Sequence, residues 1–413
     1  MYKRQDADRG GRVHGVSVGR QSSVKRNRNN YSFGDSHIDV PSGDVAKLKA
    51  NVAAIRTLKE IEESGLPATD EQKAILAKYS GWGGLSNALN DEKYNARKSY
   101  YGADKNWNEK YLPYYEQLIE LLTPEEFRSA VQSTTTSHYT PETVIRSMWD
   151  IAGRIGVKGG DVSEPAMGIG RIIGLMPDET SSRSRISGYE IDSLSGRISK
   201  ALYPDANIKV QGYETEFFPQ SKDLVITNVP FGKQAPYDKA LEKTLKKQMK
   251  GAYNLHNYFI AKSLLELKEG GIGIFVTSSA TMDGASSRFR EFASSGGFDL
   301  VGAIRLPNDA FQKDAGTSVT ADVLVFRRRK SGEKPNEINF ISTTQIGEGN
   351  YQENGETRTK PIMVNEYFAS HPEMMLGEMM TAYDAGSGGL YSGASQTLKA
   401  KPCLLYTSPS PRD

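Results

Sequence analysis

The sequence predicts an α/β protein whose main domain is a doubly wound, Rossmann-like sheet, and two observations carry this prediction. From residue 137 onward, short apolar segments alternate with segments of helical periodicity. The last two apolar segments have no long helix between them, so we expect an antiparallel hairpin to end the sheet. Strands separated by helices of this length otherwise form a parallel sheet. We expect strands at 160–164, 186–190, 207–211, 222–227, 272–278, 298–304 and 320–327, and helices at 169–176, 192–202, 254–268 and 285–295.

A small helical domain is expected before the sheet, over residues 44–135. Apolar residues recur at helical spacing after residue 44. Two further helices are predicted by the capping-box spacing of Thr69 with Gln72 and of Thr123 with Glu126.

The remaining boundaries follow from composition. Residues 6–43 are rich in Gly, Ser, Asn and Arg without any period, which is typical of a flexible basic arm. The sheet domain occupies residues 136–330, and the polar, poorly periodic residues 331–402 form an extension or linker. The two ends, 1–5 and 403–413, match translations of a common sequencing-library transposon adapter. We therefore expect natural sequence only between them, as a fragment of a longer protein.

Composition narrows the class of protein. Hydrophobic residues make up 37% of the chain and charged residues 25%, as in soluble globular proteins. No apolar run approaches the ~20 residues that a membrane span needs, and the polar N-terminus has no signal peptide. The one cysteine, Cys403, lies in the adapter-like end, and the five histidines are dispersed, so we expect a cytoplasmic protein without disulfides or a metal site. The net charge of +2 neither predicts nor excludes nucleic-acid binding, which would depend on local basic patches.

The first candidate site is the turn at residues 164–170 (EPAMGIG), between a strand and a helix. Glu164 and Pro165 precede the two glycines, Gly168 and Gly170, which let the backbone approach a ligand at a helix N-terminus. The three-glycine fingerprint of dinucleotide-binding turns is absent. This form suits the carboxyl and amino ends of a methionine moiety, as in S-adenosylmethionine, better than a diphosphate. A strand-to-helix turn without a ligand has a similar pattern.

The second candidate is Glu190, at the end of the next strand. It follows Gly170 by twenty positions, where an acidic side chain reaches ribose hydroxyls in folds of this type. A carboxylate accepts hydrogen bonds from two hydroxyl groups at once. A solvated glutamate at a strand end is the alternative, and the preceding glycine turn favours the ligand role.

The third candidate is the segment Asn228, Val229, Pro230 and Phe231, which follows the buried strand at 222–227. An exocyclic amine that attacks a methyl sulfonium needs acceptors for its two hydrogens, and the Asn228 side-chain oxygen and the Val229 carbonyl would supply them. Phe231 would stack on a base taken out of the duplex. Most Asn-x-Pro-Phe segments are ordinary turns, but this one follows the fourth strand of the predicted order.

The order of these motifs resembles that of amino-methyltransferases. More closely, the chain is similar to the large adenine-specific DNA methylases of conjugative elements and phages, over residues 45 to 380. The segments that carry the resemblance are 79–84 (YSGWGG), 138–141 (HYTP), 164–170 (EPAMGIG), 228–232 (NVPFG), 304–311 (IRLPNDAF) and 365–375 (NEYFASHPEMM).

The resemblance implies a function and further site residues. It implies methyl transfer from S-adenosylmethionine to the N6 amine of adenine in double-stranded DNA, and members of this family are often fused to a helicase domain. Tyr139 and Thr140 would then line the cofactor site, and Glu214 resembles the acidic residue that contacts the adenine ring of the cofactor. The usual catalytic form has proline where Val229 stands; because a backbone carbonyl is the acceptor there, valine keeps the chemistry.

Contact with DNA is predicted at the lysines that follow Phe231. Lys233, Lys243, Lys246 and Lys247 come soon after the predicted base site and would neutralise phosphates. A solvated helix face is the alternative, because acidic residues are interleaved with these lysines. The basic arm, from Arg9 to Arg28, is a weaker candidate.

Three other classes of function share part of this residue pattern. A glutamine-N5 protein methyltransferase or an RNA methyltransferase needs the same two acceptors, because an amide and an adenine both present an amine. A non-catalytic scaffold that binds S-adenosylmethionine or DNA would act against restriction by occupancy, but it would not need Asn228 and Phe231. A nicotinamide-dependent enzyme lacks its three-glycine turn here.

Overall fold

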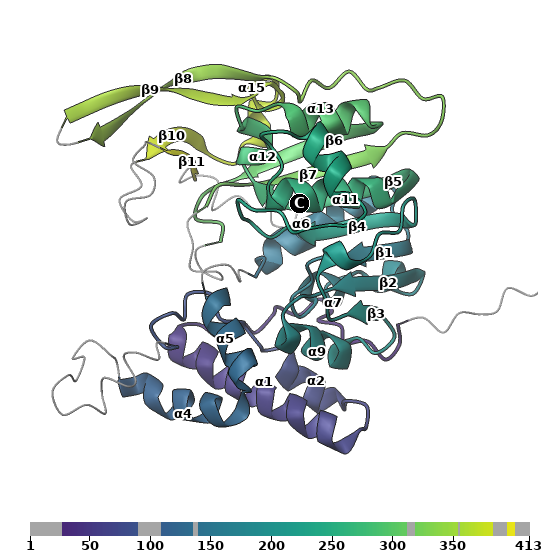
Figure 1. Ribbon diagram of the computed structural model, residues 1–413, viewed down its shortest axis with the longest axis vertical. Coiled ribbons are helices and arrows are strands. Elements are labelled where there is room, and N and C mark those ends of the chain that lie inside the picture. The colour runs from purple at the N-terminus through teal and green to yellow at the C-terminus, as the bar shows by residue number, and fades with distance from the viewer. Residues whose placement is uncertain are drawn as a thin grey trace, which may run out of the picture.

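The computed structural model describes residues 27–89, 109–134, 139–311, 319–353, 356–382 and 395–400 (Figure 1). Its centre is a seven-stranded sheet in the order β3-β2-β1-β4-β5-β7-β6, in which only β7 runs antiparallel to its neighbours. The doubly wound sheet and its antiparallel end are therefore confirmed. The strands are β1 (Gly160–Glu164), β2 (Ser184–Tyr189), β3 (Asn207–Lys209), β4 (Lys222–Asn228), β5 (Leu267–Ser278), β6 (Phe298–Leu306) and β7 (Ala321–Arg328).

Helices cover both faces of this sheet. Alternate residues of β4 separate into two apolar cores, Leu224 and Ile226 in one and Val225 in the other. The first core is closed by α6 (Glu142–Arg154), α7 (Arg171–Gly174) and α9 (Ser193–Leu202). The second is closed by α10 (Glu242–Gln248), α11 (Leu255–Glu266), α12 (Ala280–Asp283) and α13 (Arg288–Ser295).

The strand order reverses between β1 and β4, and this reversal fixes where a ligand can bind. β1 pairs with β2 on one side and with β4 on the other. The helices that follow β1 and β4 therefore leave in opposite directions, which opens a crevice at the carboxyl ends of these strands. Glu164 and Asn228, the last residues of β1 and β4, lie at this crevice.

The expected helix at 169–176 is much shorter than predicted. Gly170 adopts a left-handed conformation with φ of 77°, so α7 begins only at Arg171, and it ends at Gly174. Pro177 then starts a separate short helix, α8 (Asp178–Ser181). The chain turns twice here, which the apolar spacing alone did not indicate.

The helical segment before the sheet contains α1 (Asp44–Ser64), α2 (Asp70–Leu76), the 3₁₀ turn η1 (Glu109–Tyr111), α4 (Leu112–Leu121) and α5 (Pro124–Ser133). Both predicted capping boxes are present, at the starts of α2 and α5. In Figure 1 these helices lie beneath the β3 end of the sheet, and α1 and α2 contact α9. Arg197 on α9 pairs with Glu62 on α1 and with Glu126 on α5, so the helical segment is joined to the sheet.

The basic arm was expected to be flexible from residue 6 to 43, and part of it is not. Residues 6–26 lie outside the described residues, but residues 27–43 pack against the sheet domain. The backbone N–H of Tyr31 donates to Leu202 on α9, and that of Phe33 donates to Gly174 on α7. The side chain of Asn27 also donates to the Ser181 carbonyl. These bonds fasten the segment to α7, α8 and α9, which corrects the prediction for this part.

Residues 331–402, expected as an extension or linker, contain further regular structure. A long hairpin of β8 (Thr343–Glu353) and β9 (Glu356–Asn365) extends from the top of the molecule in Figure 1. It is followed by α15 (Glu366–Ser370), the 3₁₀ turn η3 (Pro372–Met374) and a second hairpin of β10 (Glu378–Ala382) and β11 (Ser395–Lys399). The buried side chain of Asn365 donates to the carbonyls of Met282 and Phe340, which fastens the extension to α12.

No helix in the described ranges combines the length and the apolar character that crossing a membrane requires. The adapter-like ends, 1–5 and 403–413, lie outside the part of the chain that the structure describes.

Candidate active site

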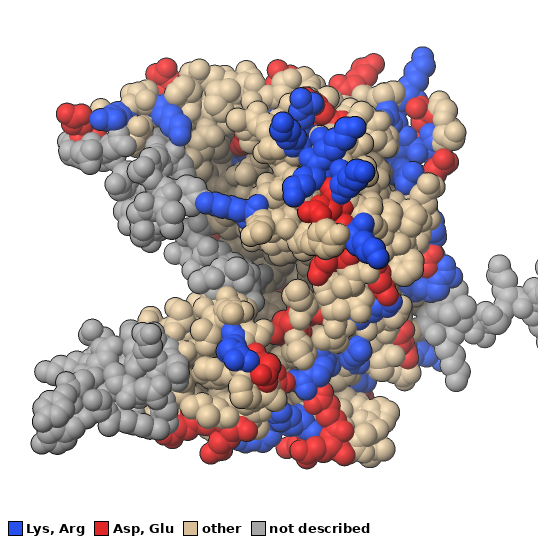
Figure 2. Space-filling model, in the orientation of Figure 1, with Lys and Arg blue, Asp and Glu red and all other residues tan. Residues whose placement is uncertain are grey.

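A cavity of about 740 Å³ opens at the carboxyl ends of β1, β2 and β4. In Figure 2 the molecule is hollowed on the same side, between the helical segment and the sheet domain. The four candidate catalytic residues, Asn228, Val229, Pro230 and Phe231, all line this cavity. So do the cofactor candidates Tyr139, Thr140, Glu164, Pro165, Gly168, Glu190 and Glu214.

Gly170 is the one cofactor candidate that does not line the cavity. Its carbonyl accepts a hydrogen bond from the Tyr203 hydroxyl at 2.7 Å, and a Cβ at this position would collide with the Tyr203 ring. Its left-handed conformation also favours glycine. Gly170 therefore shapes the turn from behind, while Gly168 faces the cavity.

Glu190 is held at the floor of the cavity by backbone donors. Its carboxylate accepts the N–H of Gly168 at 2.7 Å and the N–H of Asp192 at 2.7 Å. Burial raises the pKa of Glu190 to about 7, although these two N–H groups act in the opposite direction. The side chain is therefore fixed in position and titrates near neutral pH.

Glu164 is buried at the end of β1, with 2% of its surface exposed. Its Oε2 atom has no hydrogen-bond partner among the described residues. Burial, with a smaller contribution from Glu190, raises the pKa of Glu164 well above its ordinary value. A buried carboxyl oxygen without a partner is costly, and a donor or a cation in the cavity would satisfy it.

Tyr139 joins the helical segment to the glycine turn. A Cβ built on Gly81 would lie 2.8 Å from the Tyr139 ring, and one built on Gly168 would lie 3.1 Å from it. The ring thus fits between two glycines from different parts of the chain. The Arg171 guanidinium lies over the ring, 4.3 Å from its centroid, and also donates to the Tyr79 carbonyl.

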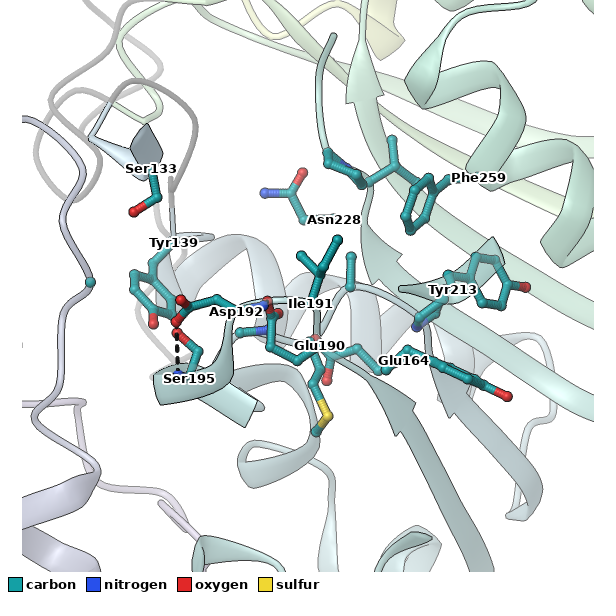
Figure 3. A pocket seen from close by; sticks show the side chains of 18 of the residues that line it. Ser133, Tyr139, Glu164, Glu190, Ile191, Asp192, Ser195, Tyr213, Asn228 and Phe259 are labelled. Atoms are coloured by element: carbon teal, nitrogen blue, oxygen red, sulfur yellow. Dashed lines mark hydrogen bonds between the residues drawn. The ribbon is translucent and has the colours of Figure 1, made fainter. Parts of the chain in front are cut away.

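Asn228 projects into the open part of the cavity. Figure 3 shows its side chain between Ser133 of α5 and Phe259 of α11. Its Oδ1 atom is buried and accepts no hydrogen bond from the described residues. The next residue, Val229, donates its N–H to the Val276 carbonyl at 3.0 Å, which fixes the backbone at the end of β4. The site thus has an uncommitted acceptor on a rigid strand end.

Two aromatic side chains line the cavity near Asn228. Phe231 follows it in the chain, and Phe259 comes from α11. The neighbour of Phe259 on α11, Tyr258, is fully buried behind the cavity, where its hydroxyl donates to Asp238 at 2.7 Å.

Several lining residues were missed by sequence reasoning. Gly81, Trp82, Ser129, Gln132 and Ser133 come from the helical segment. The YSGWGG segment was noticed as part of the resemblance, but nothing in it indicated a role. These residues reach the cavity only because the helical segment docks on the sheet domain. A local sequence pattern does not encode such docking.

Additional missed residues follow β2. Ile191, Asp192 and Ser195 line the cavity beside Glu190, and Asp192 accepts hydrogen bonds from the Ser195 N–H and the Ser129 hydroxyl. Asp192 is the N-cap of α9. A capping aspartate two residues after Glu190 was the available signal.

The candidate DNA-binding lysines do not line the cavity. Lys233 is exposed two residues after Phe231, and Lys243, Lys246 and Lys247 are exposed on α10. Lys246 pairs with Glu242 at 3.3 Å. Figure 2 shows Lys and Arg side chains gathered above the hollow on the viewed face, so this surface is basic.

The charge of the cavity fits a cationic ligand. Four carboxyl groups line it, from Glu164, Glu190, Asp192 and Glu214, against the one guanidinium of Arg171. A sulfonium cofactor with an ammonium group suits this balance, whereas a pyrophosphate would be repelled. Within the described ranges, no group of three or more His, Cys, Asp or Glu is arranged to hold a metal ion.

Comparisons with known proteins agree with this interpretation. Residues 168–296 match the family model of the Eco57I restriction-modification methylase. A curated relative, Defense against restriction protein B of Escherichia phage P1, is 24% identical over 309 residues. That match covers 74% of this chain and 11% of the relative, so the chain spans about a ninth of the length of the relative.

Two solved structures have a similar fold. One is a type I restriction-modification methyltransferase subunit from Streptococcus thermophilus, with a TM-score of 0.40 and 16% identity, covering 68% of this chain and 66% of that one. The other, from Listeria monocytogenes, is described as a class I S-adenosylmethionine-dependent methyltransferase, with a TM-score of 0.42 and 16% identity, covering 70% and 91%.

The family match runs from Gly168 through α13 and so includes Glu190, Glu214 and Asn228 of the cavity, but not β1. Together with the strand order and the charge of the cavity, it supports a methyltransferase domain that uses S-adenosylmethionine and is similar to restriction-modification methylases.

Proposed function

We propose that this chain methylates the N6 amine of adenine in double-stranded DNA, with the target base flipped into the cavity. The observation that carries the proposal is Asn228, whose buried and unpartnered Oδ1 lies in the same cavity as Glu190 and Glu164. S-Adenosylmethionine supplies an already activated methyl group when bound, so the residues of the chain mainly have to bind, orient and exclude water.

The roles of the residues follow from their places in the cavity. Glu190 binds the ribose hydroxyls of the cofactor. The Oε2 atom of Glu164 accepts a hydrogen bond from the methionine end of the cofactor. Glu214, Tyr139 and Thr140 complete the cofactor wall. Asn228 Oδ1 and the Val229 carbonyl accept the two hydrogens of the target amine, which directs its lone pair at the methyl group.

The aromatic side chains beside Asn228 favour a planar base over a glutamine amide as the substrate. Phe231 and Phe259 line the cavity beside Asn228, and a flipped base stacks between such rings. A glutamine side chain would present the same amine but would leave these rings without a stacking partner. Pro230 keeps Phe231 in place through its restricted backbone.

The duplex outside the cavity needs positive charge. We propose that Lys233, Lys243, Lys246 and Lys247 bind phosphates of the DNA that flanks the flipped base. A helicase domain elsewhere in a longer protein stays a prediction from the resemblance, as do the domain boundaries at 44–135, 136–330 and 331–402.

The test is identification of the product. The chain and its Asn228→Ala variant are incubated with labelled S-adenosylmethionine and unmodified duplex DNA, and the DNA is digested to nucleosides. We expect label in N6-methyladenine for the parent alone. Label in a protein or RNA offered in parallel, and none in DNA, would instead support the glutamine or RNA alternative. Cofactor binding without transfer to any substrate would support the anti-restriction scaffold.

A further inference from the structure

A buried ion pair lies directly behind the cavity and takes no part in the chemistry described above. Lys262 on α11 and Asp238 in the loop before α10 are both 0% exposed, and Lys262 Nζ lies 2.8 Å from Asp238 Oδ2. Lysine and aspartate are almost never fully buried unless they are paired. Such a pair joins two segments at a defined distance, because neither buried charge can be solvated by water instead.

Asp238 fastens the loop on the target side of the cavity. Its Oδ1 accepts the N–H groups of Ala240 and Leu241, both at 2.9 Å, and its Oδ2 accepts the Tyr258 hydroxyl at 2.7 Å. The loop that begins at Phe231 thus returns to the protein at Asp238. Two contacts therefore set the position of this loop relative to α11: the Asp238 carboxylate, and the hydrogen bond from the Leu255 N–H to the Gly232 carbonyl at 3.2 Å.

Lys262 fastens the opposite wall. Its Nζ donates to the Tyr213 carbonyl at 2.8 Å and lies 4.6 Å from the centroid of the Tyr213 ring. Tyr213 opens the 3₁₀ turn η2 (Tyr213–Thr215), and both of its neighbours, Gly212 and Glu214, line the cavity. Displacement of Tyr213 would therefore move the wall assigned to the adenine ring of the cofactor.

The negative charge of Asp238 is maintained in this network. Burial by itself would raise the pKa of Asp238, but hydrogen bonds from Lys262 and Tyr258 outweigh burial and lower it. The carboxylate is thus ionised at neutral pH and can hold the ammonium group and the loop together.

We propose that the Lys262–Asp238 pair positions the cofactor wall and the target loop relative to each other, so that methyl donor and amine meet at the correct distance. The inference rests on the proposed function only for the target, because the cofactor wall can be tested without DNA. Lys262 and Asp238 are positioning residues, since neither lines the cavity.

The test separates position from stability with a double variant. Lys262→Met alone would leave Asp238 buried without its cation and lower the melting temperature, by roughly 10 °C. Adding Asp238→Asn removes the second charge while keeping the shape and an acceptor for the loop. We expect the double variant to melt within a few degrees of the parent, because removing both charges also removes their desolvation cost.

We do not expect the double variant to regain cofactor binding and methyl transfer along with its stability. The double variant lacks the bond to the Tyr213 carbonyl, so we expect S-adenosylmethionine to bind roughly tenfold more weakly. We expect single-turnover methyl transfer at saturating cofactor to fall by roughly tenfold to a hundredfold. A double variant with parental cofactor affinity and parental rate would overturn the proposal.

Two further variants keep the result interpretable. Lys268→Met removes another lysine, which pairs with Asp161 and Asp223, both at 2.7 Å, at the amino ends of β1 and β4 and so at the opposite end of these strands from the cavity. It should change stability and leave both functional measurements at the parental values; an equal functional loss would reduce the Lys262 effect to stability alone and overturn the proposal.

The second is Tyr258→Phe, which removes a single neutral bond to Asp238 and decides the question if the double variant does not fold. We expect a severalfold slower transfer at unchanged cofactor affinity, because only the target loop loses a bond. An unchanged rate would overturn the proposal. A parent that binds S-adenosylmethionine and modifies no DNA contradicts the proposed function, while the affinity measurements still test the wall.

Discussion

On the cofactor side of the cavity, hydrogen bonds within the protein already hold the loops. The Ser199 hydroxyl donates to the Gly168 carbonyl at 2.7 Å, the Tyr203 hydroxyl donates to the Gly170 carbonyl at 2.7 Å, and Glu190 accepts two N–H groups. Other buried atoms on this side, Glu164 Oε2, Ser163 Oγ and Trp82 Nε1, have no hydrogen-bond partner among the described residues. The glycine turn and Glu190, however, are held in place in advance of any ligand.

The target side is different. Asn228 Oδ1, Tyr253 Oη, Asn257 Oδ1 and both ring nitrogens of His256 are buried without hydrogen-bond partners among the described residues. Burial lowers the pKa of His256 to about 4, so this ring is neutral at physiological pH. Among these residues only Asn228 lines the cavity. Because buried polar groups are normally satisfied, a donor from a substrate would complete Asn228 Oδ1. Hydrogen bonds within the protein thus hold the cofactor turn, whereas the acceptor on the target side has no partner among the described residues.

The largest effect is expected at Asn228, where the two sides can be separated most sharply. Asn228→Ala removes one acceptor of the target amine, so we expect single-turnover transfer to fall by about 10²–10³-fold. The cofactor side keeps all of its bonds, and the affinity for S-adenosylmethionine should stay within about twofold. Rapid-quench kinetics and calorimetry measure the two quantities. A similar loss in both would mean that Asn228 acts on the cofactor.

A smaller effect is expected from the exposed lysines of α10. Replacing Lys243, Lys246 and Lys247 together by alanine should weaken DNA binding and reduce the slope of log K against log salt by about 0.9 for each phosphate that the protein no longer neutralises. Cofactor affinity should not change. The control replaces Lys158 and Lys200, which lie before β1 and on α9, away from α10. An unchanged salt slope would make the α10 lysines a solvated helix face.

The two sides also differ in how much the sequence revealed. Asn228 and Glu190 were predicted because each stands at the end of its own strand, so local alternation locates both the strand and the residue. Trp82 and Ser129 reach the same cavity only through docking of the helical segment on α9, which no local pattern encodes. Lys262 was missed for another reason: a lysine within a helix is ordinarily solvated, and its burial depends on Asp238, twenty-four residues earlier in the chain.

The extension was predicted least well. The hairpin of β8 and β9 has a mostly exposed β9, with a buried face only from Ile362 onward, so alternation of apolar residues is weak. It is anchored at its base by the buried side chain of Asn365 and by Ile362 and Val364 in the second core. A polar ribbon that is anchored only at its base has the composition of a linker, and that composition produced the prediction.

Glu190 offers a test of the cofactor side through pH. Because burial raises the pKa of Glu190 to about 7, its carboxyl is mostly neutral at pH 6 and mostly ionised at pH 8. In the proposed role the ionised form accepts two ribose hydroxyls, so affinity for S-adenosylmethionine should increase by about tenfold as the pH rises across this range. Glu190→Gln should bind roughly tenfold more weakly at pH 8 and lose most of this dependence. Calorimetry at several pH values measures both; parallel pH profiles would remove Glu190 from the cofactor site.

The smallest effect, and the most selective, is expected where the helical segment meets the cofactor side. Gly81 and Gly84 both have positive φ, 65° and 77°, so alanine at either position strains the backbone by about 1–2 kcal/mol. Only at Gly81 does the added Cβ meet a neighbour, the Tyr139 ring at 2.8 Å, whereas Gly84 has nothing within 4 Å. The pair therefore separates strain from contact with Tyr139.

We expect both Gly81→Ala and Gly84→Ala to lower the melting temperature through the shared backbone cost, and Gly81→Ala to lower it further through the contact with Tyr139. Only Gly81→Ala should weaken S-adenosylmethionine binding, by severalfold, since it pushes Tyr139 toward Gly168 and so toward the glycine turn. Calorimetric titration of both variants makes the comparison. Equal affinities would mean that the helical segment closes the cavity without touching the cofactor, and the wall formed in advance would then belong to the sheet domain alone.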